Sequence, residues 1–181
     1  MPFNGFTPEM YAQKMIDELK AAGVRPRDVF AQSFNKADVL YWVQHEPAFA
    51  KQAVFLDDAN VVADLPTFSD LVGYRQQGIR IWAPPTFALL ALDGSNRVVA
   101  SQAARDAKEA GLDIITWTLE RSGVLADGNN GFYYQTIDQA IQRDGDLYKV
   151  LDVLAKDVGI LGVFSDWAAP ITFYANCMGL K

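Results

Sequence analysis

The sequence predicts a single α/β domain built around a parallel sheet, and three observations lead to this prediction. Apolar, strand-like segments alternate with helical segments about five times along the 181 residues, which indicates repeated strand–helix–strand units. The linking segments are short, and no change of composition marks a domain boundary within residues 1–181. Residues 111–120 are predicted to be a buried strand that follows a helix and ends among polar side chains, which is the unit of α/β enzymes.

The composition excludes several classes of protein. Half of the residues are hydrophobic and 21% are charged, as in ordinary globular proteins. The net charge of −6 argues against binding to nucleic acid, which needs clustered Lys and Arg. No run reaches the roughly 18 apolar residues that a membrane span requires, and no signal peptide is expected at the N-terminus. The localisation stays open, because the single Cys177 fits either a reducing compartment or a fragment that has lost a partner cysteine.

Local capping signals predict the helices. Thr7 is expected to be the N-cap of a first helix, with Pro8 in its first turn and Gly23 after its end, because these residue types favour those positions. Asn35 is expected to cap a helix that runs to about residue 46, and Thr67 another that runs to about residue 76. Further helices are expected at residues 101–110, 146–157 and 170–178.

Five strands are expected between these helices. They are predicted at residues 28–34, 52–56, 78–82, 111–120 and 160–165. Residues 87–92 are expected to form a short helical turn and residues 93–96 a tight turn. Residues 122–135, which include the run Phe132-Tyr133-Tyr134, form a long predicted loop, and loops of this length are more often functional than passive.

Polar and aromatic side chains follow the predicted strands at their C-terminal ends, where α/β proteins collect ligand groups. In chain order they are Gln32, Ser33, Asp57, Asp58, Trp82, Trp117, Thr118, Glu120, Ser165 and Asp166. Amide, hydroxyl, carboxylate and indole groups are suited to holding a polar ligand. No nucleophile and base stand together in the pattern, so the sequence predicts a binding surface rather than a complete catalytic centre.

Several of these residues have two interpretations. Trp117 is equally compatible with the core and with a site wall, whereas Trp82, which precedes two prolines, is better placed for a wall. Asp166 can be a helix N-cap or a ligand contact. The pair at residues 57 and 58 can bind a metal, but a turn that leads into a helix is the commoner use. His45 is expected at a helix C-terminus facing solvent, and Cys177 is expected to be buried.

Three segments resemble the glycerophosphodiester phosphodiesterase family. These segments are Ala31-Gln32-Ser33-Phe34, Ile115-Thr116-Trp117-Thr118, and Gly162-Val163-Phe164-Ser165-Asp166 followed by Pro170. They are similar to the Gln-Ser-Phe, Trp-Thr and Gly-Ile-x-Thr-Asp-x-Pro strands of that family, in the same order. Residues 32–35 and 81–85 also resemble the branch found in fungi and some bacteria. Each motif is short, and their order over nearly the whole chain makes the resemblance moderately specific.

The resemblance implies a TIM-type barrel that hydrolyses glycerophosphodiesters with a divalent metal, Mg or Ca. The family places two histidines in His-Arg-Gly and His-Asp motifs, and its metal-binding carboxylates lie after the second and fourth strands; none of these motifs occurs here. A complete barrel also needs about 250 residues. We therefore expect a partial barrel of the last four to five strand–helix units, which begins after the fourth strand. Since four strands should remain, the strand at residues 78–82 is expected to be short or to lie outside the ladder.

Two functional hypotheses follow. In the first, this chain supplies the substrate pocket of a phosphodiesterase, with Gln32, Trp82, Trp117 and Asp166 against the glycerol or the leaving group. The metal ligands lie elsewhere, and the isolated chain is expected to be inactive. In the second, the chain is a non-catalytic half-barrel module that forms a homodimer or pairs with a complementing N-terminal half. A truncated gene product without an independent role is a third possibility.

Overall fold

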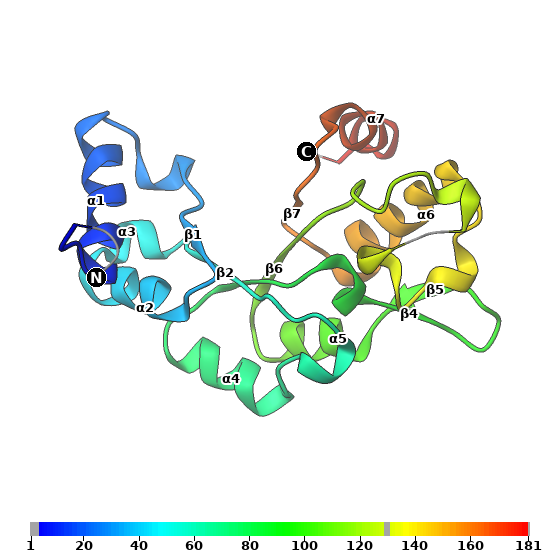
Figure 1. The fold of residues 1–181 in the computed structure, drawn as a ribbon, viewed down its shortest axis with the longest axis horizontal. Helices are drawn as coiled ribbons and strands as arrows, with labels where there is room; N and C mark the ends of the chain where they lie inside the picture. Colours follow the sequence, from blue (N-terminus) through cyan, green and yellow to red (C-terminus); the bar gives the residue numbers. More distant parts are fainter. Residues whose placement is uncertain (1–3, 129–130, 181) are drawn as a thin grey trace.

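The protein has a mixed α/β fold with a five-stranded parallel sheet at its centre (Figure 1). The computed structural model describes residues 4–128 and 131–180. The sheet strands are β1 (Gln32–Ser33), β2 (Val54–Leu56), β3 (Ile81–Ala83), β6 (Asp113–Thr116) and β7 (Gly162–Val163). They lie side by side in chain order, β1-β2-β3-β6-β7, so each crossover adds the next strand to the same side of the growing sheet.

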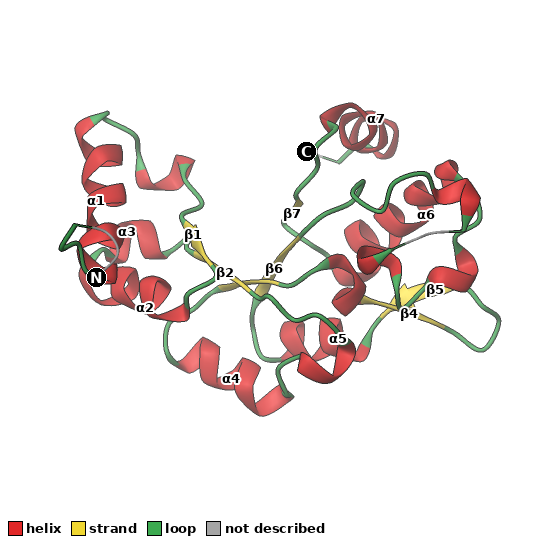
Figure 2. Cartoon of the chain, in the orientation of Figure 1, coloured by secondary structure: helices red, strands yellow, loops and turns green. Residues whose placement is uncertain are grey.

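Helices connect the strands and surround them, as Figure 2 shows. They are α1 (Pro8–Ala21), α2 (Lys36–His45), α3 (Pro47–Ala50), α4 (Phe68–Gln76), α5 (Gln102–Glu109), α6 (Leu147–Asp152) and α7 (Ala168–Met178), and a π-helix (Val153–Val158) continues α6. Figure 1 places α1–α3 and α7 at opposite ends of the sheet, because β1 and β7 are its edge strands.

The predicted caps of the early helices are confirmed. The Thr7 side chain accepts a hydrogen bond from the backbone N–H of Met10, 3.2 Å away. The Asn35 side chain accepts one from the N–H of Ala37 at 3.1 Å. Thr67 and Asp70 form a reciprocal capping box at the start of α4, which satisfies backbone donors that a helix leaves unpaired.

The structure corrects two expectations about the middle of the chain. β3 does not lie outside the ladder: it is short, but it is the central strand and pairs with both β2 and β6. The expected helical turn at residues 87–92 is only partly helical. A 3-10 helix (Thr86–Leu89) leads directly into β4 (Leu90–Leu92), which forms an antiparallel hairpin with β5 (Val98–Ala100). The predicted turn at residues 93–96 closes this hairpin, and β5 packs against the π-helix that continues α6.

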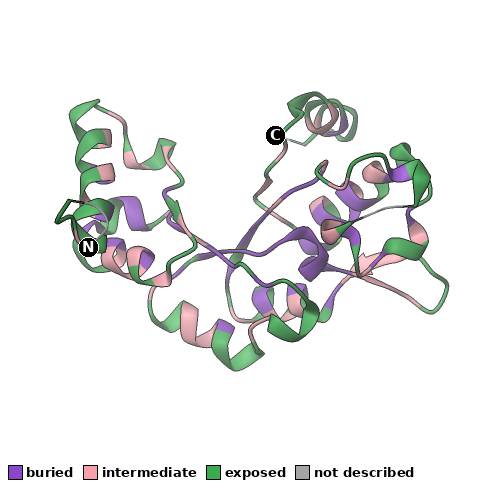
Figure 3. Ribbon diagram, in the orientation of Figure 1, coloured by how far each residue is buried: buried purple, intermediate pink, exposed green. Residues whose placement is uncertain are grey.

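The two faces of the sheet differ in what covers them. Phe55, Trp82 and Ile114 share one face through the strand register, and they pack against helical side chains in the largest core cluster. Val54, Ile81 and Ile115 belong to a separate cluster made only of strand residues and Trp117. Figure 3 shows that burial is concentrated along the central strands, while α7 and the outer faces of the helices are largely exposed.

No helix within residues 4–128 and 131–180 is both long and apolar enough to cross a membrane.

Candidate functional site

The candidate site lies at the carboxyl edge of the sheet. Because the strands are parallel, their carboxyl ends meet at the same edge, where α/β proteins bind ligands. The residues that lie within two positions of the strand ends there include Phe34, Asp57, Trp117 and Ser165. The long loop after β6 returns to this edge through a 3-10 helix (Phe132–Tyr134).

An aromatic cluster, defined here as Phe34, Trp117, Phe132 and Tyr133, surrounds the end of β6. The ring centroid of Trp117 lies 5.6 Å from that of Phe34, 6.4 Å from that of Phe132 and 6.0 Å from that of Tyr133. The Trp117 indole N–H donates to the backbone carbonyl of Ala83 at 2.9 Å, which fixes the orientation of the ring. Trp117 is half-buried and packs against the strand-only core cluster. One face of the residue is therefore core, and the rest is available to a ligand.

The long loop is anchored to β6 by Tyr134. This side chain is fully buried, and its hydroxyl donates a hydrogen bond to the carbonyl of Leu119 at 2.6 Å. Burial raises the pKa of the Tyr134 hydroxyl far above its ordinary value, so the group remains a donor at any physiological pH. Because Tyr134 adjoins Phe132 and Tyr133, its anchor holds two rings of the aromatic cluster against Trp117.

Trp82 was expected to line a pocket wall, but the structure places it in the core. Its side chain is 0% exposed and lies on the helix-covered face of the sheet, so a ligand cannot touch it. The indole N–H instead donates to the Asp57 carboxylate at 2.8 Å. Asp57 also accepts from the backbone N–H of Ala59 at 3.0 Å. Trp82 therefore acts on the carboxyl edge only indirectly, by holding the turn after β2.

Asp57 is a buried carboxylate, 9% exposed. Burial raises the pKa of its carboxyl above the ordinary aspartate range, although the hydrogen bonds from Trp82 and Ala59 oppose this shift. Both of its oxygens are occupied by protein donors, and the residue forms the turn that leads toward α4. This placement agrees with the interpretation of the Asp pair as a turn before a helix.

A polar network joins the ends of β6 and β7. The Ser165 hydroxyl donates a short hydrogen bond to one oxygen of Glu120, and the other oxygen accepts from the backbone N–H of Asp166 at 3.1 Å. The Asp166 side chain forms an ion pair with Arg121 at 2.7 Å, and the hydrogen bonds from Arg121 lower the pKa of the Asp166 carboxyl. Asp166 is not the N-cap of α7, because that position belongs to Trp167.

Gln32 lies on the exposed edge strand β1. Its register partner is Val54, which in turn pairs with Ile81. These register positions put Gln32 on the same face of the sheet as the strand-only cluster, the face against which Trp117 packs. Of the four residues expected to line the pocket, the structure thus places Gln32 and Trp117 on one face, Trp82 on the other, and Asp166 in the loop after β7.

The two residues expected to have no role in the site have different outcomes. His45 is the last residue of α2 and is exposed, with its ring centroid 4.4 Å from that of Tyr41, as predicted. Cys177 is exposed rather than buried, so that expectation is wrong. It lies near the end of α7, where residues 176–178 are all exposed.

The described residues do not fit a metal centre of their own. Nowhere in residues 4–128 and 131–180 do three or more His, Cys, Asp or Glu side chains converge as potential ligands. The carboxylates of Asp57, Glu120 and Asp166 are each bound to protein donors. No chemical step in this chain is therefore assigned to a metal.

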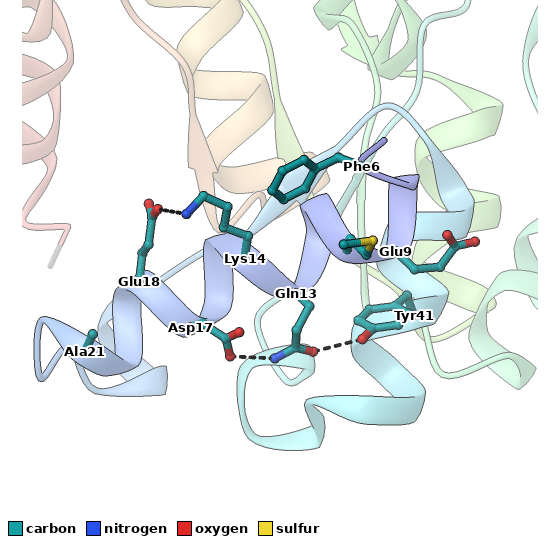
Figure 4. Close-up of a pocket in the computed structure, with 9 residues that line it drawn as sticks. Phe6, Glu9, Gln13, Lys14, Asp17, Glu18, Ala21 and Tyr41 are labelled. Atoms are coloured by element: carbon teal, nitrogen blue, oxygen red, sulfur yellow. Dashed lines mark hydrogen bonds and ion pairs between the residues drawn. The ribbon is translucent and has the colours of Figure 1, made fainter. Parts of the chain in front are cut away.

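A shallow cavity of about 650 Å³ lies away from this edge, on the outer surface of α1 (Figure 4). Phe6 and Met10 form part of its lining. The polar groups beside it are already paired: Tyr41 donates to Gln13 at 3.0 Å, and Gln13 donates to Asp17 at 2.8 Å. The cavity therefore offers apolar surface beside side chains that are largely paired with one another.

Sequence reasoning missed two features of the site. It did not predict the ring contacts of Phe34 and Tyr133 with Trp117, although the loop that contains the Phe132-Tyr133-Tyr134 run is predicted to be functional. It also did not pair Glu120 with Ser165, which are 45 positions apart. The sequence did show that Glu120 lies within a predicted strand end and Ser165 at another. It could not show that these two strand ends are neighbours in the sheet.

The fold and the site together define an α/β protein whose parallel sheet presents aromatic and acidic side chains at its carboxyl edge. No protein-family model matches the sequence. The chain is 45% identical over 188 aligned residues to a protein of Arthroderma benhamiae (strain ATCC MYA-4681 / CBS 112371) named "Extracellular protein". The alignment covers 99% of this chain and 76% of that relative. The chain belongs to the same family as this extracellular protein.

Proposed function

We propose that this chain is the substrate-pocket portion of a glycerophosphodiester phosphodiesterase-like hydrolase with the architecture of a partial TIM barrel. Such an enzyme splits a glycerophosphodiester with water into an alcohol and glycerol 3-phosphate. The proposal extends the resemblance of the three strand motifs to the whole chain. By analogy with the name of the Arthroderma relative, it also places the protein outside the cell.

The observation that carries the proposal is the position of Trp117. The residue belongs to the Trp-Thr motif, and it lies at the carboxyl edge of consecutive parallel strands, half-buried and surrounded by three further rings. In α/β barrels this edge is where substrates bind. The five strands lie side by side in chain order, which is the order that successive units of a barrel require.

The residues of the chain have separate tasks in this proposal. Trp117 and the aromatic cluster contact the glycerol or the alcohol group and exclude water from it. Gln32, on the same face, offers an amide to a hydroxyl or a phosphate oxygen. Glu120, held by Ser165, and Asp166, held by Arg121, shape the polar side of the pocket. A divalent metal would neutralise phosphate charge in the intact enzyme, and its ligands are expected outside this chain.

A comparison of two proteins tests this function. The full-length Arthroderma relative is expected to release choline from glycerophosphocholine in the presence of Mg²⁺ or Ca²⁺, measured by a coupled choline assay. The 181-residue chain is expected to release none under the same conditions, because the proposal assigns the groups that activate water to other segments of the enzyme. Turnover by the chain alone would contradict the assignment of the chemistry to other segments. If the relative were folded but inactive, the proposed relation to glycerophosphodiester phosphodiesterases would be contradicted.

A second candidate function is an assembly module, and exposed apolar side chains at both ends of the sheet favour it. On α1, Met10 and Tyr11 are 50% and 70% exposed. Leu161, which precedes β7, and Phe173, on α7, are 55% and 59% exposed. The backbones of β1 and β7 each have only one strand neighbour among the described strands. Unpaired edges and apolar patches of this kind favour association with another copy or another chain.

Self-association has a direct test. If two copies cover each other through the α1 surface, the weight-average mass should rise with concentration in multi-angle light scattering, and Tyr11→Glu should shift this rise to at least tenfold higher concentration. Val62→Glu is the matched control, because Val62 is similarly exposed but lies in the loop after β2. A concentration-independent monomer mass would count against this candidate.

A further inference from the structure

Large apolar side chains are exposed on four of the five carboxyl-edge loops of the sheet, those that follow β1, β2, β6 and β7. We define the apolar rim as Phe34, Val61, Val62, Val124 and Trp167, which are 52%, 47%, 57%, 60% and 67% exposed. Isolated exposed apolar residues are normal on protein surfaces. Here they recur on every one of these loops, and such a concentration marks an interaction surface.

Side-chain contacts join the four loops at a single edge of the sheet. Phe34 contacts the Trp117 ring edge-on. The Gln135 side chain, in the loop after β6, donates to the carbonyl of Asn60, which directly precedes Val61, at 3.0 Å. Arg121, three positions before Val124, pairs with Asp166, which directly precedes Trp167. The loops after β1, β2 and β7 therefore each contact the segment after β6, so the apolar rim is gathered at one edge of the sheet instead of being scattered over the molecule.

The charge of these loops is strongly one-sided. Residues 34–35, 57–67, 117–146 and 164–167 contain nine Asp or Glu and only two Arg, with no Lys. Asp57 and Asp146 are buried, which leaves seven acidic side chains against the two Arg. An anionic membrane or a nucleic acid would be repelled by this surface. A zwitterionic phospholipid surface is different, because its outermost charge is the cationic choline group, which carboxylates attract.

We propose that the apolar rim docks this protein onto a phosphatidylcholine surface. The side chains of Val61, Val62, Val124 and Trp167 enter the headgroup layer, and the acidic loops around them face the choline groups. Trp is suited to this boundary because its ring combines an apolar body with an N–H donor. Tips on four separate loops fit a deformable lipid surface better than a rigid protein groove. Docking would bring the aromatic cluster to lipid-borne headgroups, but the binding itself does not depend on the proposed hydrolysis.

Vesicle co-sedimentation tests the proposal. The chain is expected to sediment with phosphatidylcholine vesicles, and the double variant Val62→Ser/Trp167→Ser should partition at least tenfold more weakly. Phe173→Ser is the matched control: Phe173 is 59% exposed but lies on α7, so its loss should change partitioning less than twofold. Replacing a third of the lipid by phosphatidylserine should weaken binding. Both variants should keep the wild-type unfolding midpoint, since all three side chains are exposed.

Four outcomes would overturn the proposal. They are no sedimentation with phosphatidylcholine, stronger binding to the phosphatidylserine mixture, an equal loss in Phe173→Ser, and a double variant that changes the mass in solution but not the binding to vesicles. The last outcome would assign the rim to a second copy of the chain. None of these readouts uses hydrolysis, so failure of the docking and failure of the proposed function remain distinguishable.

Discussion

Replacing Trp82 with alanine should lower the free energy of unfolding by about 3–5 kcal/mol, the usual cost of truncating a buried aromatic residue. The side chain is 0% exposed and packs in the largest core cluster, so the truncation leaves a cavity between the sheet and its helices. It also removes the donor to Asp57, which leaves a buried carboxylate with one partner fewer. Urea titration followed by circular dichroism measures the change.

Two further variants separate the causes of this loss. Trp167→Ala removes the same side chain type from a position that is 67% exposed, and it should change the unfolding free energy by no more than about 0.5 kcal/mol. Trp82→Phe keeps most of the ring volume but removes the N–H donor, and it should cost about 1–3 kcal/mol. If Trp82→Ala were as mild as Trp167→Ala, the placement of Trp82 in the core would be wrong.

Replacing Trp117 with alanine should weaken the binding of glycerophosphocholine roughly tenfold. An aromatic contact contributes about 0.5–1.5 kcal/mol, and a choline cation over an indole face adds about 0.5–1 kcal/mol at an exposed site. Trp117 is the centre of the aromatic cluster and contacts three other rings, so its removal opens the whole wall. Chemical-shift titration of the chain with glycerophosphocholine gives the dissociation constants.

The conservative variant and the metal provide the controls for Trp117. Trp117→Phe keeps a ring at this position but loses the hydrogen bond to Ala83, and it should bind with an affinity between those of the wild type and Trp117→Ala. In a reconstituted enzyme, Trp117→Ala should leave metal affinity unchanged, because the metal ligands are expected on other strands. A loss of metal binding instead would show that Trp117 is not simply a pocket wall.

The alternation of strands and helices was predictable because its signals are local. Thr7, Asn35 and Thr67 each cap the helix that follows within three residues, and such contacts depend only on neighbouring sequence. The parallel sheet follows from the same alternation. Strand lengths were less predictable: residues 28–34 include only the two-residue β1, and a 3-10 helix (Pro26–Asp28) ends at the first residue of that segment.

The hairpin β4–β5 was missed for a related reason. Residues 90–92 are apolar and continue directly from the 3-10 helix (Thr86–Leu89), so no break in the pattern marks the change from helix to strand. Only the pairing with residues 98–100 makes them a strand. The exposure of Cys177 was missed because an apolar helix is normally buried, and what covers a helix is a property of its neighbours.

The sequence by itself thus determined the alternation of the five parallel strands with helices, the N-caps of α1, α2 and α4, and the strand ends at which polar and aromatic side chains gather. The tertiary structure alone decided which of those groups share a surface. Both faces of a parallel sheet are apolar, so no periodicity shows that Trp82 faces the helices while Trp117 faces the strand-only cluster. The pairing of Glu120 with Ser165 likewise arises from the adjacency of β6 and β7, which brings distant positions together only when the sheet forms.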